Sequence, residues 1–174
     1  GKAEVFIRGA RSVLSTVAEI ELSGNGGEWV KVSCSVKALE TQMGRLVIIF
    51  KGNGHIGVDC VSLLPSKVWG DPDKYRNGKL SPRIVKGLKD CHPSFFRFPG
   101  GCVVEGDEIF DNMYKWRNTV GALEERRQIA NTWGYMQSYG VGFYEYFALC
   151  EDLKMTPLPV LHCGLLCQIR VGEQ

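Results

Sequence analysis

Short apolar segments that alternate with polar positions dominate the first third of the chain. Alternation with a period of two is typical of half-buried β-strands. The turns between these segments are rich in glycine, as at 23–27 and 51–54. The expected strands are residues 5–7, 17–22, 29–36, 46–50 and 55–63. Regularly spaced short strands are typical of a sandwich, so we expect residues 1–64 to form part of a β-sandwich.

The pattern changes after residue 64. Residues 65–80 are rich in proline, glycine and asparagine, which predicts a linker or surface loop. Ser81 followed by Pro82 is typical of a helix start, because proline is tolerated at the first helical position. The helix is expected to extend to about residue 88, with an apolar face made of Ile84, Val85 and Leu88.

The second half of the chain predicts a repeat of strand, helix and strand. Residues 94–98 are mostly aromatic and end at Pro99, which indicates a buried strand. The elements expected after it are a loop with one helical turn at 99–125, a partly helical segment at 128–139, a helix at 141–154 and a second buried strand at 157–162. This order is typical of βα repeats with parallel strands, so the predicted fold class is mixed α and β.

Composition narrows the functional classes. Hydrophobic residues make up 44% of the 174 residues and charged residues 23%, which predicts a packed core rather than disorder. The formal net charge is +2 and no block of Lys and Arg stands out, so neither nucleic acid nor an anionic membrane is indicated as a partner. No apolar run reaches the length of a membrane span. Because the chain starts at Gly1 without an initiator methionine, we interpret it as a piece of a longer protein.

The most distinctive chemistry lies at the end of the strand predicted at 94–98. Arg97 stands between phenylalanines, and Gly100 and Gly101 follow Pro99. A guanidinium in aromatic surroundings calls for a carboxylate or hydroxyl partner, and glycines let a ligand approach the main chain. Barrel enzymes hold their polar groups at C-terminal strand ends, which makes this segment a candidate site.

Motifs in this half of the chain resemble those of one enzyme family. They are Arg97–Gly106, Tyr114–Gly121, Glu124–Arg126, Asn131–Tyr135 and Gly140–Tyr146, with Val61–Pro65 and Arg76–Gly78 upstream. In this order they resemble the α-L-arabinofuranosidases of glycoside hydrolase family 51. The resemblance implies an incomplete jelly-roll-like sandwich of the carbohydrate-binding type. It also implies that residues 81–174 are the first part of a catalytic (β/α)8 TIM barrel.

The resemblance implies a reaction as well. Family members hydrolyse terminal α-L-arabinofuranosyl groups of arabinan and arabinoxylan with retention of configuration, through a covalent glycosyl-enzyme. Both catalytic glutamates are expected downstream of residue 174, so the chain holds no catalytic residue and is expected to be inactive alone. The alternatives are a non-catalytic carbohydrate-binding module, for which Trp29 is the clearest aromatic contact, and a structural fragment that depends on a partner.

The resemblance also implies the ligand, whereas the oligomeric state and the location are separate expectations. We expect an arabinose-containing polysaccharide or oligosaccharide as the ligand and a possible homo-oligomer in the full-length enzyme. An extracellular or periplasmic location is favoured over a cytoplasmic one. No cofactor is expected, because the family uses none in catalysis.

Five residues make up the expected substrate-binding site: Arg97, Gly100, Gly101, Cys102 and Trp116. The resemblance implies that Arg97 lies at the base of the sugar pocket and braces the catalytic carboxylates, with a structural ion pair as the alternative. Cys102 stands where many relatives carry an asparagine that hydrogen-bonds arabinose, and a thiol is a poor donor and a weak acceptor. Trp116 either stacks on a sugar face or anchors its loop.

Three carboxyl groups just after the glycines, on Glu105, Asp107 and Glu108, form the obvious local cluster for acid–base chemistry. The resemblance instead gives Glu105 a role in holding its loop. For Glu145 it implies a structural partner rather than catalysis. Trp133 and Tyr135 are expected to serve packing.

The seven cysteines are odd in number and irregular in spacing, which argues for buried thiols and against a complete disulfide framework. His162, Cys163 and Cys167 offer at most three ligands, which is too few for a tetrahedral zinc site. We therefore expect no metal. We also expect reduced thiols in preference to a bond between Cys163 and Cys167.

Overall fold

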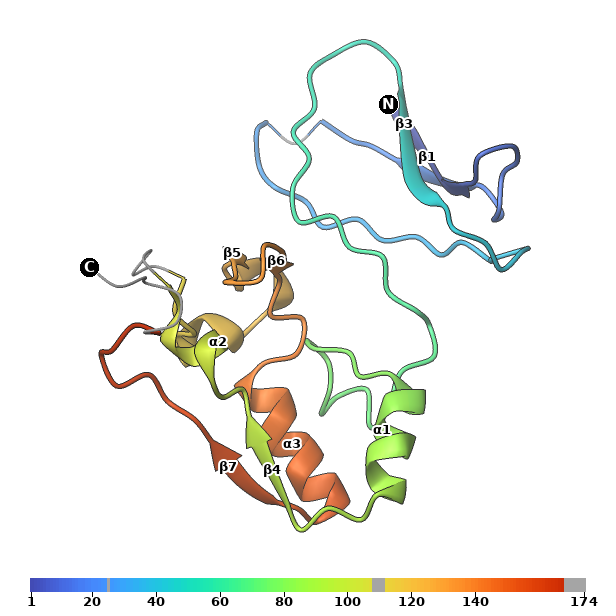
Figure 1. Ribbon diagram of the computed structural model, residues 1–174. Helices are drawn as coiled ribbons and strands as arrows, with labels where there is room; N and C mark the ends of the chain where they lie inside the picture. Colours follow the sequence, from blue (N-terminus) through green and yellow to red (C-terminus); the bar gives the residue numbers. More distant parts are fainter. Residues whose placement is uncertain (25, 108–111, 168–174) are drawn as a thin grey trace. The chain divides into compact units, whose positions relative to one another are not determined.

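Two compact units make up the chain, Gly1–Leu63 and Leu64–Gln174 (Figure 1). The computed structural model describes residues 1–24, 26–107 and 112–167. Among these residues the first unit contains strands, and the second contains both helices and strands. The expected mixed α and β class is therefore confirmed.

A three-stranded antiparallel sheet organises the first unit, in the order β2-β1-β3. Its strands are β1 Lys2–Arg8, β2 Ala18–Glu21 and β3 Arg45–Lys51. β1 lies in the centre and pairs along its whole length with β3. Ala3 and Val5 of β1 are buried together with Leu14 from the next loop, so the small core of this unit forms around its central strand.

The strands predicted at 29–36 and 55–63 do not form. Both segments are irregular, and Trp29 is 74% exposed with its ring against Gly57. Alternation indicates which side chains would face a core, but it supplies no partner for the backbone, and β2 and β3 already occupy both edges of β1. The described part of this unit therefore holds one sheet and, beyond it, isolated bridges.

A parallel pair of strands forms the centre of the second unit. β4 Phe95–Phe98 pairs with β7 Thr156–Pro159, and helix α3 Phe143–Leu153 lies between them in the chain. Figure 1 shows α3 running alongside the two strands. Parallel neighbours need a long crossover connection, which α3 and the preceding loops supply. The predicted βα repeat with parallel strands is confirmed.

Aromatic side chains hold α3 on the strand pair. The centre of the Phe98 ring lies 5.3 Å from that of Phe143, 4.9 Å from that of Tyr146 and 5.2 Å from that of Phe147. Phe98 is 2% exposed. Edge-to-face and tilted ring pairs at such distances stabilise a core beyond the area they bury. This cluster positions the end of β4, and therefore the segment that follows it.

Helix α1, Pro82–Asp90, begins as predicted, with Ser81 at the N-cap and proline in the first turn. Its predicted apolar face is only partly right, since Val85 is 1% exposed whereas Ile84 is 73% exposed. Adjacent residues project about 100° apart around a helix, so a narrow contact with the core does not bury both.

The segment predicted to be partly helical, 128–139, contains a small antiparallel hairpin instead. β5 Ile129–Ala130 pairs with β6 Met136–Gln137. The Asn131 Oδ1 accepts a hydrogen bond from the Trp133 N–H at 2.9 Å. Asparagine closes turns in this way more readily than it joins helices, so the turn residues outweigh the weak helical pattern.

The loop predicted at 99–125 holds more helical structure than the single turn expected. It contains α2 Cys102–Glu105 and two 3-10 turns, η1 Trp116–Thr119 and η2 Leu123–Glu125. Figure 1 shows α2 directly beyond the end of β4. Among the described residues, no helix has both the length and the apolar character needed to span a membrane.

The expected linker at 65–80 contributes to the second unit. Tyr75 is 1% exposed, and its hydroxyl donates a hydrogen bond to Asp152 at 2.6 Å. Lys74 forms ion pairs with Asp152 at 2.6 Å and with Glu151 at 2.7 Å. Burial, together with the nearby carboxylate, raises the pKa of Tyr75 well above its usual range. These contacts join the segment to α3.

Candidate functional site

Arg97 lies on the exposed face of β4. Phe96 and Phe98 contact α3, so the alternation of a strand turns Phe95 and Arg97 to the opposite side. β7 is exposed along its length as well. The predicted burial is therefore wrong for β7 and only partly right for β4, because α3 packs on Phe96 and Phe98 whereas Phe95, Arg97 and all of β7 are exposed.

The turn after β4 brings Gly100 against the guanidinium of Arg97. A Cβ at Gly100 would lie 2.6 Å from the Arg97 Cζ, so a larger residue would displace the side chain. Gly100 has φ +81° and Gly101 has φ +61°, a region that glycine adopts without strain. Among the described residues, Arg97 makes no hydrogen bond and no ion pair. Three predicted site residues thus lie together, and their role in binding stays a prediction.

Cys102, the first residue of α2, approaches Cys167 in the loop after β7. Their Sγ atoms are 3.1 Å apart, and Cys167 is 3% exposed. Glu105 completes the group, with the ligand atoms of all three residues within 4.8 Å of one another. Sequence reasoning considered Cys163 as the neighbour of Cys167, but Cys163 is exposed and Cys102 holds that place. The missed signal is that both cysteines follow the C-terminal ends of predicted parallel strands.

Trp116 lies in η1, beside the start of α3. Its ring centre is 6.4 Å from that of Phe143, the Arg117 guanidinium lies 5.9 Å from the ring centre, and the side chain is 44% exposed. The Trp116 side chain is thus both packed near Phe143 and partly exposed, and its stacking on a sugar stays a prediction. Trp133 and Tyr135, expected to pack, are 49% and 59% exposed, because the hairpin turn carries them outward.

The described carboxylate side chains of the loop after β4 have different surroundings. Asp107 accepts a hydrogen bond from the Asn112 side chain at 2.7 Å, and its own N–H donates to the Asn112 Oδ1 at 3.0 Å. This reciprocal pair ties Asp107 to Asn112, so Asp107 has a structural contact. Glu105 is half-buried beside the thiols. Glu108 lies outside the described residues.

A buried ion pair organises the start of α3. Arg126 and Glu145 are 4% and 0% exposed. The guanidinium donates to both carboxylate oxygens, at 2.7 and 3.0 Å, and to the carbonyls of Gly121 and Tyr139. The structural partner expected for Glu145 is therefore confirmed. Its identity as Arg126 was missed, although a carboxylate in the apolar first turn of a helix already calls for a buried cation.

Backbone groups complete the hydrogen bonding of Glu145. The carboxylate accepts hydrogen bonds from the N–H groups of Gly78 at 3.0 Å and Gly142 at 2.8 Å. Burial by itself raises the pKa of Glu145, but the hydrogen bonds from Arg126 and these amides outweigh it and hold the pKa below its usual value. The pair is therefore ionised at neutral pH, with its acceptors occupied by the fold.

Thr119 joins η1 to this network. Its hydroxyl donates to the Trp116 carbonyl at 2.8 Å and accepts from the Phe143 N–H at 3.1 Å, so it caps α3. A Cβ at Gly142 would overlap the Thr119 carbonyl oxygen, which leaves room only for glycine. The loop that carries Trp116 is thereby fastened to α3.

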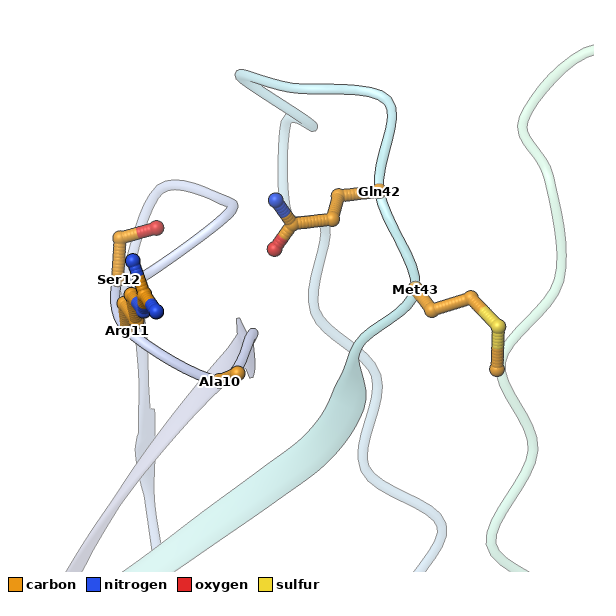
Figure 2. Close-up of a pocket in the computed structure, with 5 residues that line it drawn as sticks. All are labelled: Ala10, Arg11, Ser12, Gln42 and Met43. Atoms are coloured by element: carbon orange, nitrogen blue, oxygen red, sulfur yellow. The ribbon is translucent and has the colours of Figure 1, made fainter.

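A separate hollow lies in the first unit. Its volume is about 400 Å³, and its lining residues are Ala10, Arg11, Ser12, Gln42 and Met43. Figure 2 shows Gln42 extending towards Arg11 and Ser12, whereas Met43 points away from them. The hollow is open to solvent, and Met43 is 93% exposed. It has neither a carboxylate nor a buried polar group, so we assign the candidate site to the end of β4.

Comparison with known proteins gives the family. Residues 87–174, half of the chain, match the family described as the alpha-L-arabinofuranosidase 1 domain. The chain belongs to this family, and the resemblance to α-L-arabinofuranosidases is confirmed.

Two curated relatives show the extent of the match. The extracellular exo-alpha-L-arabinofuranosidase of Streptomyces chartreusis is 36% identical over 170 residues, which cover 90% of this chain and 19% of that protein. Alpha-L-arabinofuranosidase 2 of Arabidopsis thaliana is 34% identical over 148 residues, covering 84% of this chain and 21% of that protein. The chain spans about a fifth of the length of these relatives. They do not favour the alternative of a non-catalytic carbohydrate-binding module.

One solved structure shares the fold. It is an arabinose-bound α-L-arabinofuranosidase of family 51, with a TM-score of 0.69 and 21% sequence identity. The match covers 96% of this chain and 27% of that one. At this identity the likeness concerns the fold alone.

Proposed function

We propose that this chain is part of an α-L-arabinofuranosidase that removes terminal α-L-arabinofuranosyl groups from arabinan or arabinoxylan with retention of configuration. The observation that carries the proposal is Arg97, presented with Gly100 and Gly101 at the C-terminal end of a parallel strand. Membership of the arabinofuranosidase family supports the same function.

The fold supports a barrel origin for the second unit. The β4–α3–β7 arrangement is one βα repeat with a parallel strand pair, and a (β/α)8 barrel is built from eight such repeats. The exposed face of β4 and β7 is then the side that would point into the barrel. The sheet of the first unit is proposed to be a portion of a jelly-roll-like sandwich.

Arg97 is proposed to hold a catalytic carboxylate in its ionised form. A guanidinium offers donors in a planar fork that suits a carboxylate or a pair of sugar hydroxyls. A cation beside a carboxylate lowers its pKa, which suits the nucleophile of a retaining glycosidase. The exposed Arg97, without an ionic partner among the described residues, has these donors available.

Neither catalytic carboxyl group is proposed to come from this chain. Retaining glycosidases use two carboxyl groups about 5–5.5 Å apart, one as the nucleophile and one as the acid and base. Glu145 is sealed in the ion pair with Arg126, and Asp107 is held by Asn112. Glu105 is proposed to hold its loop. The isolated chain is therefore expected to be inactive.

Around Arg97, the other site residues are proposed to contact the sugar. The half-exposed ring of Trp116 offers a stacking surface, and Cys102 offers a weak polar contact. The ligand is an arabinose-containing polysaccharide or oligosaccharide. We propose an extracellular or periplasmic location for the whole protein, and a homo-oligomeric state for it as well.

A chimera tests the function. This chain replaces the matching segment of the Streptomyces chartreusis enzyme, and the purified chimera is assayed with an aryl α-L-arabinofuranoside. We expect turnover by the chimera and none by the 174-residue chain alone. Turnover by the chain alone, above a heat-denatured control, would show that it holds its own catalytic groups. A folded chimera without turnover would contradict the proposed function.

A further inference from the structure

Two cysteines that are far apart in sequence meet beside the candidate site. The Sγ atoms of Cys102 and Cys167 are 3.1 Å apart. The backbone holds the two segments together as well, because the Cys167 N–H donates to the Gly106 carbonyl at 3.4 Å. A disulfide bond has a length of about 2.05 Å, so the sulfur atoms would have to close by only about one ångström.

The geometry suits a disulfide better than a bound metal. Two thiolates on a tetrahedral zinc ion, each about 2.3 Å from it, lie about 3.8 Å apart, which is wider than the observed separation. Glu105 is the third group within reach, and among the described residues no fourth ligand completes the cluster. A zinc ion would therefore need both a wider pair of thiols and a further ligand.

We propose that Cys102 and Cys167 are a redox pair that forms a reversible disulfide. The oxidant is a low-molecular-weight disulfide such as oxidised glutathione. The thiolate of Cys102, the more exposed of the two, attacks the oxidant and releases one molecule of reduced glutathione. The thiolate of Cys167 then attacks the mixed disulfide and releases the second. Two protein thiols are oxidised to one disulfide, and one oxidant molecule is reduced to two thiols.

The bond would join the two loops that define the candidate site. Cys102 follows the turn that holds Gly100 against Arg97, and Cys167 follows β7, the parallel neighbour of β4. Oxidation would fix the start of α2 covalently to the loop beyond β7, whereas in the reduced state non-covalent contacts such as the hydrogen bond from Cys167 to Gly106 hold the two segments together. A consequence of this bond for sugar turnover rests on the proposed function, whereas formation of the bond itself does not.

Peptide mapping of the native chain tests the pair directly. The full chain is equilibrated with oxidised and reduced glutathione over a range of ratios, quenched with N-ethylmaleimide, digested and analysed by mass spectrometry without reductant. We expect a peptide pair linked through Cys102 and Cys167 to form before any other linkage. The same treatment in concentrated urea is expected to scatter the linkages, because the proximity is a property of the fold.

Two variants and one metal titration complete the test. Cys91→Ser removes an exposed cysteine on another segment and is expected to leave the linkage unchanged. Glu105→Gln is also expected to leave it unchanged, because a disulfide needs no carboxylate. Alkylation of both cysteines under fully oxidising conditions would overturn the proposal. Stoichiometric binding of Zn²⁺ alone that is lost in Glu105→Gln would also overturn it and assign a metal site instead.

Discussion

Two arginines of the second unit have opposite surroundings. Arg126 is 4% exposed, and its donors are occupied by Glu145 and by two backbone carbonyls. Arg97 is exposed at the end of β4 and has no such partner among the described residues. A guanidinium that the fold satisfies completely cannot bind anything else, whereas one left open at a strand end can. Burial and hydrogen bonding thus separate a structural charge from a candidate binding charge.

The glycines near each arginine repeat the contrast. Gly142 has no space for a Cβ because the backbone of Thr119 lies against it. Gly100 has no space because the side chain of Arg97 lies against it, and a side chain can move. The first contact holds the fold together, and the second shapes the surface. Substitutions in the two regions should therefore differ in kind as well as in size.

The largest effect is expected for Glu145→Gln. The change leaves the buried Arg126 charge without its anion, and breaking such a pair costs about 3–5 kcal/mol of unfolding free energy. Urea unfolding followed by circular dichroism measures the loss. Glu105→Gln makes the same chemical change in the other region and is expected to cost about 1 kcal/mol or less, because it leaves no buried cation without its anion. Equal losses in the two variants would erase the contrast.

Gly142→Ala is expected to have the next largest effect. The added Cβ would overlap the Thr119 carbonyl oxygen, and overpacking of this kind costs about 1–3 kcal/mol. Gly87→Ala in α1 is the matched control, because a Cβ there meets nothing within 4 Å. It is expected to stabilise the chain by about 0.4–1 kcal/mol through a less flexible unfolded state. A destabilised control, or an unaffected Gly142 variant, would contradict the packing assigned here.

A smaller effect is expected from acid. Glu145 and Asp152 are both buried enough for their pKa values to rise, but their hydrogen-bonded cations hold both values below the usual range. A depressed folded pKa stabilises the protein above the unfolded value, which is about 4, and the stabilisation is lost as the pH falls through the folded value. The unfolding free energy should therefore decrease as the pH is lowered below about 4. Asp152→Asn should make this fall shallower, and an unchanged slope would count against the assignment.

Local patterns predicted the centre of the second unit well. The aromatic strand, the helix at 141–154 and the strand after it each carry a strong signal, and two strands joined through a helix pair in parallel. The two-residue strands of the hairpin are too short to show a period. The segments 29–36 and 55–63 alternate correctly and still lack a partner strand, because pattern alone does not supply one.

The candidate site was predictable only in its local part. Arg97 and its glycines are close in sequence, and the motif names them. The partners Arg126 and Glu145, and the pair Cys102 and Cys167, are distant in sequence, and only the fold brings them together. Exposure was mispredicted for β4 because an apolar strand indicates a covered face but does not specify how many faces are covered.

The most direct test compares substitutions of Arg97 and Arg126 within one protein, the chimera made from this chain and the Streptomyces chartreusis enzyme. Arg97→Gln is expected to leave the Tm within about 2 °C and to lower kcat/KM by about 100-fold, the loss of one charge-assisted hydrogen bond to a reacting group. Arg126→Gln is expected instead to lower the Tm by several degrees, because it leaves the buried Glu145 carboxylate without its cation. A folded Arg97→Gln chimera with undiminished kcat/KM, or one destabilised as much as Arg126→Gln, would contradict the assignment of Arg97 to the site.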